Sequence, residues 1–204
     1  MKKFLLIILL CSASSPLFSQ NSAGVFTILL GGSAGKFNID AGGNFNSVYS
    51  NNKPVYTGVF GLGNGALFLI GKYRVFNTSG QSTVTNSTAT GSAEWKQNIL
   101  LTGLRFGPGT SAVYLDALYV FNHAEEKIGT TNPAVDALSA DQKIDQNGFA
   151  FAFGLSPKLA GPLDLDLEVE YSAKIQKTTL ANGTDAPSLG GLYLSAGLSF
   201  YFNN

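Results

Sequence analysis

The sequence predicts an all-β fold: an eight-stranded antiparallel up-and-down β-barrel that crosses a membrane, with short turns at one end and long loops at the other. Three observations predict it. Residues 163–176 alternate apolar and polar side chains without exception, which is the pattern of a strand with one apolar and one polar face. Seven other segments show the same alternation more weakly. The connections between segments are alternately short and long.

Length and composition suit one such domain. The chain has 204 residues, of which 13% are charged, and it is rich in glycine (24), phenylalanine (15) and tyrosine (8). It contains no apolar run of the roughly eighteen residues that a membrane-spanning helix needs. The formal net charge is zero and basic residues are not clustered, so the composition excludes a nucleic-acid partner.

The N-terminus has the organisation of a secretion signal. Lys2 and Lys3 precede an apolar core over residues 4–10 and a small-residue region over residues 12–19. We predict a signal peptide over residues 1–19, cleavage before Gln20, and a barrel domain over residues 20–204. Cys11, the only cysteine, leaves with the signal. The alternative is a lipoprotein signal that keeps Cys11 as an acylated first residue.

The eight predicted strands follow from the alternation and from the turn signals between segments. Long polar connections follow the first, third, fifth and seventh strands. The second of these, over residues 77–93, is rich in small polar residues and is predicted to be mobile. Asn132 and Pro133 in the third predict one short helix. The predicted strands cover residues 24–36, 55–62, 66–76, 94–106, 112–123, 148–157, 163–176 and 192–202.

Alternating loop lengths place every short turn at one end of a barrel, as in outer-membrane proteins, whose periplasmic turns are short and whose external loops are long. Together with the signal, the strand at 163–176 and the ending Leu198–Phe202, this makes the chain resemble the small eight-stranded outer-membrane barrels, the OmpX-like and OmpA-transmembrane-domain-like families. In those families a C-terminal aromatic is read by the outer-membrane assembly machinery. Here Asn203 and Asn204 follow Phe202.

The resemblance implies a monomer in the outer membrane of a Gram-negative-type bacterium. Its partners would be the membrane lipid and, during biogenesis, the assembly machinery. It implies no cofactor and names no surface ligand. A soluble lipocalin-type barrel is the structural alternative, since alternation alone does not say which face is inside. The predicted inward faces carry Gly, Ala, Ser and charges, and the others carry Leu, Phe, Val and Tyr, which favours a lipid-facing belt.

An eight-stranded barrel has an interior only wide enough for side chains. Alternation turns a set of charged residues into it, and buried charges must be paired. We expect Lys72 and Arg74 to pair with Glu168 and Glu170, and Arg105 to reach Asp164, Asp166 or Asp116. The expected role is a structural charge network, and the alternative is a site for cations or protons. The network consists of Lys72, Arg74, Arg105, Asp116, Asp164, Asp166, Glu168, Glu170 and Lys174.

Two motifs raise the possibility of enzymatic chemistry. His123, the only histidine, precedes Glu125 and Glu126 at the predicted outer rim, where lipid-A-modifying barrel enzymes place a catalytic histidine. The deacylase pattern has serine where Glu125 stands. Ser33 lies in a G-x-S-x-G sequence, but a nucleophile elbow needs a helix after it, and residues 36–40 do not predict one. No catalytic, cofactor-binding or metal site is predicted.

Three functions stay open at this stage. The first is a non-enzymatic outer-membrane scaffold whose external loops bind a partner or support envelope integrity. The second is a small-solute channel, which the filled interior disfavours. The third is an enzyme of the outer leaflet, which the incomplete catalytic set disfavours.

Overall fold

The computed structural model describes residues 27–39, 48–49, 53–64, 66–83, 90–107, 112–130, 142–174 and 188–203. In these ranges no helix is long and apolar enough to cross a membrane. The predicted signal peptide with Cys11, and the helix predicted at Asn132 and Pro133, lie outside the described residues. The strands within them are β1 (Thr27–Ile39), β2 (Val55–Asn64), β3 (Leu67–Thr83), β4 (Thr90–Phe106), β5 (Val113–Thr130), β6 (Gln142–Leu155), β7 (Lys158–Ala160), β8 (Leu163–Lys174) and β9 (Gly191–Asn203).

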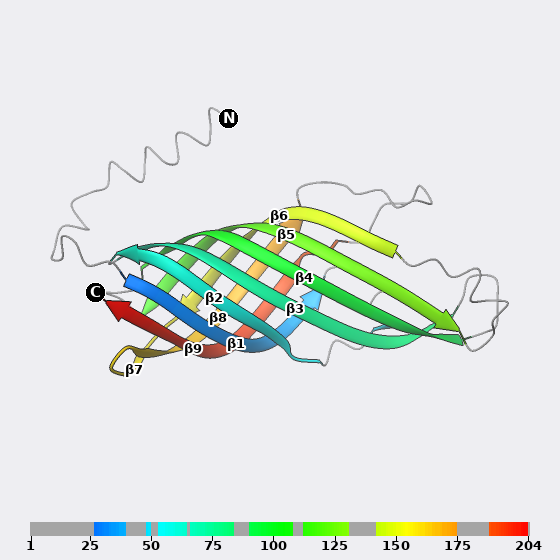
Figure 1. Ribbon diagram of the computed structural model, residues 1–204, viewed down its shortest axis with the longest axis horizontal. Helices are drawn as coiled ribbons and strands as arrows, with labels where there is room; N and C mark the ends of the chain where they lie inside the picture. The colour runs from blue at the N-terminus through cyan, green and yellow to red at the C-terminus, as the bar shows by residue number, and fades with distance from the viewer. Residues whose placement is uncertain are drawn as a thin grey trace, which may run out of the picture.

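The strands close into a barrel. Neighbours from β1 to β6 pair antiparallel, β8 pairs with β6 and β9, and β9 pairs with β1. The three-residue β7 pairs with the start of β8 and takes no part in the closure. The predicted eight-stranded, all-antiparallel, up-and-down barrel is therefore confirmed. Figure 1 shows the first and last strands, β1 and β9, side by side.

The strand register gives the barrel a stagger. A path that starts at Thr27 of β1 and moves from each residue to its partner on the next strand returns to β1 at Phe37, ten residues further along. Such a shift tilts the strands relative to the barrel axis. Every residue on this path lies on the inward face of its strand. The path runs through Thr27, Gly63, Phe68, Arg105, Asp116, Ala152, Glu170, Tyr193 and Phe37.

The two ends of the barrel differ. At the end we call the turn end, β2 connects to β3 and β4 connects to β5 through few residues, and β1 begins and β9 ends there. At the opposite end, the loop end, 15 residues separate β1 from β2 and 11 separate β5 from β6. The predicted long connections are therefore present after β1 and β5, and after β8, where 16 residues precede β9; the β3–β4 connection, also predicted to be long, has six residues, the same number as the β4–β5 connection.

Alternating side chains sort into an apolar exterior and a packed interior. On β8, Val169 and Tyr171 are exposed, whereas Asp166, Glu168 and Glu170 are buried. The same exterior carries large apolar side chains on every strand of the ring. Because the apolar faces point outward, the arrangement argues against the soluble lipocalin-type alternative.

Strands β3 to β6 reach at least four residues further toward the loop end than the sequence predicts, and β1 reaches Ile39 rather than residue 36; Figure 1 shows the length of β3, β4 and β5. Strand β3 continues to Thr83, β4 begins at Thr90, β5 continues to Thr130 and β6 begins at Gln142. The expectation of a mobile loop over the whole of residues 77–93 is therefore wrong at both ends of that range. Exterior side chains there are polar, so the apolar alternation that marks a strand stops while the backbone pairing goes on.

Candidate functional site

A cluster of charged side chains fills the middle of the lumen. Strand β3 contributes two cations, β4 one, β5 one carboxylate and β8 three carboxylates. All seven are buried, because inward alternation on four strands points them at one another across a space that admits only side chains. We call this set the charged cluster: Lys72, Arg74, Arg105, Asp116, Asp166, Glu168 and Glu170.

The ion pairs predicted between β3 and β8 are present. Lys72 Nζ lies 2.6 Å from Glu168 Oε2 and 3.3 Å from Glu170 Oε2. Arg74 makes a two-pronged contact with Glu170, Nη1 to Oε1 at 2.8 Å and Nη2 to Oε2 at 3.2 Å. Strands β3 and β8 lie on opposite sides of the ring, so these pairs tie the two walls together across the lumen.

Arg105 makes the contact predicted with Asp116. Its Nε and Nη2 donate to Oδ1 and Oδ2 of Asp116 at 2.8 and 2.9 Å. Arg105 Nη2 also lies 3.3 Å from Glu168 Oε2, and Nη1 lies 3.8 Å from Asp166 Oδ2. Lys72 Nζ reaches Asp116 at 2.8 Å. One continuous network therefore joins four strands.

Two residues expected in the network lie outside the buried set. Lys174 is exposed, because it is the last residue of β8 and stands at the rim of the loop end, beyond the packed lumen. The prediction that Lys174 belongs to the interior is wrong. Asp164 is only half-buried; it lies near the start of β8, and its neighbours are Ser156 and Lys158 rather than Arg105.

Aromatic and hydroxyl side chains complete the cluster, and sequence reasoning missed them. The guanidinium carbon of Arg74 lies 3.6 Å from the ring centre of Tyr193, and that of Arg105 lies 3.6 Å from the ring centre of Tyr114. Arg74 Nε also donates to Thr57 Oγ1 at 3.1 Å. Tyr114 lies two residues before Asp116, so the same alternation rule was a signal for its inward position.

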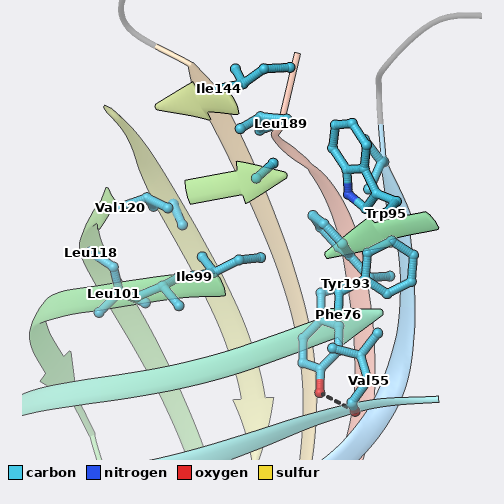
Figure 2. Close-up of a cluster of buried hydrophobic side chains, with 14 of the residues drawn as sticks. Val55, Phe76, Trp95, Ile99, Leu101, Leu118, Val120, Ile144, Leu189 and Tyr193 are labelled. Atoms are coloured by element: carbon cyan, nitrogen blue, oxygen red, sulfur yellow. Dashed lines mark hydrogen bonds between the residues drawn. The ribbon is translucent and has the colours of Figure 1, made fainter. Parts of the chain in front are cut away.

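Toward the loop end the lumen is filled mainly by apolar side chains, with a few buried polar ones such as Gln97 and Gln146 among them. The expectation that inward faces carry mainly small and charged residues is wrong there, because β1, β3, β4, β5 and β9 also turn aromatic and branched side chains inward. Figure 2 shows these side chains converging, with Tyr193 Oη donating to the Val55 carbonyl at 3.4 Å. We call the set the apolar plug; it includes Phe37, Val55, Phe76, Trp95, Ile99, Leu101, Leu118, Val120, Ile144, Leu189 and Tyr193.

Two segments outside the strands close the plug. Tyr49 pairs as an isolated bridge with Gly80, packs its ring 5.9 Å from that of Trp95 and donates to Glu126 Oε1 at 2.6 Å. Leu189 is held through its backbone: its N–H donates to Gln146 Oε1 at 2.9 Å and its carbonyl accepts from Gln97 Nε2 at 3.0 Å.

A charged exterior band lies beyond the apolar belt. On β5, exposed Phe121 is followed on the same face by His123 and Glu125. His123 Nδ1 lies 2.6 Å from Asp145 Oδ1, and this hydrogen bond raises the pKa of His123 above its ordinary value. Lys143 Nζ lies 3.3 Å from Glu125 Oε1, and that contact lowers the pKa of the Glu125 carboxyl.

Neither His123 nor Ser33 has the neighbours that its catalytic motif requires among the described residues. The cross-strand partners of His123 are Asn98 and Asp145, neither of which carries a hydroxyl or thiol nucleophile. Ser33 lies within β1, paired with Thr57 and Gly197, so no helix follows it. No group of three or more His, Cys, Asp or Glu side chains placed to hold a metal is found among the described residues.

Comparison with known proteins identifies the fold. No family model matches the sequence, and no curated protein matches it. Among solved structures, the outer membrane protein OprG from Pseudomonas aeruginosa is similar with a TM-score of 0.55 and 15% identity over 89% of this chain and 97% of that one. Ail, the attachment invasion locus protein of Yersinia pestis, solved in complex with the heparin analogue sucrose octasulfate, has a TM-score of 0.50 and 16% identity over 88% of this chain and 100% of that one. The fold is that of the small eight-stranded outer-membrane β-barrels.

Proposed function

We propose that this chain is a non-enzymatic integral protein of the bacterial outer membrane, a monomeric scaffold that presents its loop end outside the cell. The apolar exterior belt supports contact with lipid, because such a surface is unstable in water. In this proposal the turn end faces the periplasm, and an assembly machinery that reads the aromatic ending inserts the barrel. The likeness of this fold to other outer-membrane barrels supports the proposed location.

The observation that carries the scaffold proposal is the filled lumen. Toward the loop end the apolar plug blocks it, and in the middle the charged cluster spans it with contacts between 2.6 and 3.3 Å. A solute would have to break several buried ion pairs to pass. Liposomes that contain the refolded protein should therefore swell in sugar or amino-acid solutions no faster than empty liposomes. Solute-dependent swelling would favour the channel alternative.

The extended strands support display at the loop end. Strands β3, β4 and β5 have 17, 17 and 18 residues, whereas about ten residues suffice to cross a bilayer when tilted. The surplus forms a sheet that would stand clear of the membrane. An epitope tag inserted between Thr130 and Gln142 should be labelled by antibody on intact cells. The matched control is the same tag between Gly107 and Ala112, which should be labelled only after the membrane is opened.

An outer-leaflet enzyme is the weaker candidate, because His123 has no hydroxyl or thiol nucleophile among its cross-strand partners. Lipid extracts of cells with and without the protein should be identical by mass spectrometry. An acyl or headgroup difference that disappears with His123→Ala would overturn the non-enzymatic assignment.

A further inference from the structure

The charged cluster does not balance. Among the described residues, four buried carboxylates face three buried cations. An isolated ionised carboxylate is costly to bury, and such a group takes a partner or becomes neutral instead. The contacts of the four carboxylates decide which of them is the one in excess.

Three of the four have cations in direct contact. Asp116 is bound by Arg105 and Lys72 at 2.8 Å each. Glu168 lies 2.6 Å from Lys72, and Glu170 lies 2.8 Å from Arg74. These distances are typical of charge-assisted hydrogen bonds, so these three carboxylates account for the three cations.

Asp166 is different. Its Oδ1 lies 2.5 Å from Tyr114 Oη and its Oδ2 accepts from Ser199 Oγ at 2.9 Å. Both of these partners are neutral hydroxyls. The cation closest to it among the described ion pairs is Arg105 Nη1 at 3.8 Å, which is beyond hydrogen-bond distance. Asp166 is nevertheless buried, with 7% of its surface exposed.

The single proton of the Tyr114 hydroxyl also identifies Asp166 as the carboxylate in excess. Tyr114 Oη lies 2.5 Å from Asp166 Oδ1 and 2.9 Å from Glu168 Oε2. A tyrosine hydroxyl carries a single proton, which it can donate to one of these carboxylates only. The other contact needs a proton on the carboxyl group. Glu168 Oε2 already lies 2.6 Å from Lys72 Nζ and 3.3 Å from Arg105 Nη2, so the additional proton belongs on Asp166.

Arg105 gives an independent indication. Its Nη1 is buried and makes no hydrogen bond to a carboxylate within the described part of the chain, although Asp166 Oδ2 is only 3.8 Å away; the neutral Tyr201 hydroxyl also interacts with this guanidinium. An ionised Asp166 would attract this N–H into a direct bond. Nη1 does not bond to Asp166 while Ser199 donates to the same oxygen, as expected when Asp166 is neutral.

We propose that Asp166 is a proton-binding site inside the barrel. A proton from solvent forms an O–H bond at Oδ1 and is donated to Tyr114 Oη, whose own proton is donated to Glu168 Oε2. The bound proton cancels the excess charge of the cluster. The groups that face Asp166 are Arg105 from β4, Tyr114 from β5, Asp164 and Glu168 from β8, and Ser199 and Tyr201 from β9.

An amide in place of the acid tests the site. Asp166→Asn keeps the shape, can donate to Tyr114 and can accept from Ser199, so its unfolding midpoint at neutral pH should stay close to that of the natural chain. The matched control Glu170→Gln removes a charge that Arg74 binds at 2.8 Å, and it should lower the midpoint markedly. An Asp166→Asn variant as destabilised as Glu170→Gln overturns the proposal.

Proton linkage gives a second readout. If the folded barrel holds a proton that the unfolded chain releases, stability falls as pH rises. Above about pH 5, where the unfolded carboxyl is ionised, the unfolding equilibrium constant of the natural chain should rise about tenfold per pH unit relative to Asp166→Asn. Equal pH dependence of the two proteins overturns the proposal. A natural chain whose stability follows sodium or potassium concentration rather than pH also overturns it, because a metal cation would then balance the charge.

Infrared spectroscopy tests the folded protein directly and does not depend on any variant other than Asp166→Asn. At neutral pH the natural barrel should show the C=O stretch of a protonated carboxyl group, shifted in D₂O and missing from the Asp166→Asn spectrum. A spectrum of the natural chain without that band overturns the proposal. The scaffold proposal would survive this result, because it rests on the filled lumen.

Discussion

The side chain of Arg74 contacts residues from several strands of the barrel at once. Its guanidinium donates to both oxygens of Glu170, rests on the ring of Tyr193 and reaches Thr57 through Nε. A planar group with several fixed N–H donors suits such a position, and a lysine ammonium does not reproduce it. At the scale of the residue, therefore, arginine is needed for its shape as well as for its charge.

Replacing Arg74 alone should destabilise the barrel more than replacing both Arg74 and Glu170. Arg74→Met leaves Glu170 buried with only the 3.3 Å contact to Lys72, and we expect a loss of about 3–5 kcal/mol in the free energy of unfolding. Arg74→Met combined with Glu170→Met should lose less than Arg74→Met alone. Denaturant unfolding of the refolded barrel in detergent measures both. Strictly additive losses in this double-mutant cycle would show that the two side chains do not interact.

The pKa of His123 should lie above its ordinary value, because its hydrogen bond to Asp145 favours the charged ring. A raised pKa means that the contact stabilises the fold at low pH and that this contribution is lost as pH rises through the titration. NMR of the ring protons should show the midpoint falling in Asp145→Asn. Glu125→Gln is the control, with a smaller shift expected because Glu125 lies 3.6 Å away. Identical midpoints in all three proteins would contradict the contact.

At the scale of the element, the sequence predicted strands well within the apolar exterior belt and poorly beyond it. Strand β8 was predicted over residues 163–176 and spans Leu163–Lys174, because its alternation separates an apolar exterior face from the lumen face. Strands β3 to β5 were predicted too short, because beyond the apolar belt the outward side chains become polar and the period-two signal weakens. Backbone pairing continues there without a pattern that a single sequence displays.

Gly80 permits the close approach of the segment that carries Tyr49. A Cβ at Gly80 would lie 1.6 Å from the Val48 carbonyl oxygen, so Gly80→Ala should displace that segment and uncover Trp95. Because the chain has one tryptophan, its fluorescence reports on the surroundings of Trp95 alone. We expect a red-shifted, more easily quenched emission. Gly58→Ala is the control, since nothing lies within 4 Å of its Cβ; an equal change in both variants would contradict the assignment.

Depth along β8 should set the cost of a charge on its outer face. Leu167 is exposed near the middle of the strand, and Leu163 is its first residue at the turn end. Arginine near the bilayer midplane costs roughly 2–4 kcal/mol in such barrels and little near the interface. Leu167→Arg should therefore lower the unfolding free energy in lipid vesicles by more than Leu163→Arg. Equal losses would mean that the membrane is centred elsewhere.

At the scale of the whole molecule, the sequence predicted which strands face each other across the lumen and missed what else fills it. Lys72 and Glu168 were matched by strand order and height alone, and they lie 2.6 Å apart. The apolar plug was missed for a different reason. Its strands carry apolar residues on both faces, so alternation does not say which face is inside until neighbouring strands fix it.

Closure of the ring joins the first strand to the last, and its register can be tested by cross-linking. Ala34 of β1 and Ala196 of β9 are direct partners on the exterior face. Direct antiparallel partners lie about 4.5–5.5 Å apart at Cα, within the range for a disulfide. The natural chain has a single cysteine, Cys11, so in a Cys11→Ser background the double variant Ala34→Cys with Ala196→Cys should cross-link under mild oxidation and migrate differently on a denaturing gel. The control replaces Ala196→Cys by Leu198→Cys, two residues along β9, and should cross-link poorly. Preferential cross-linking of the control would mean that the ring closes in another register, and the stagger of ten residues would then be wrong.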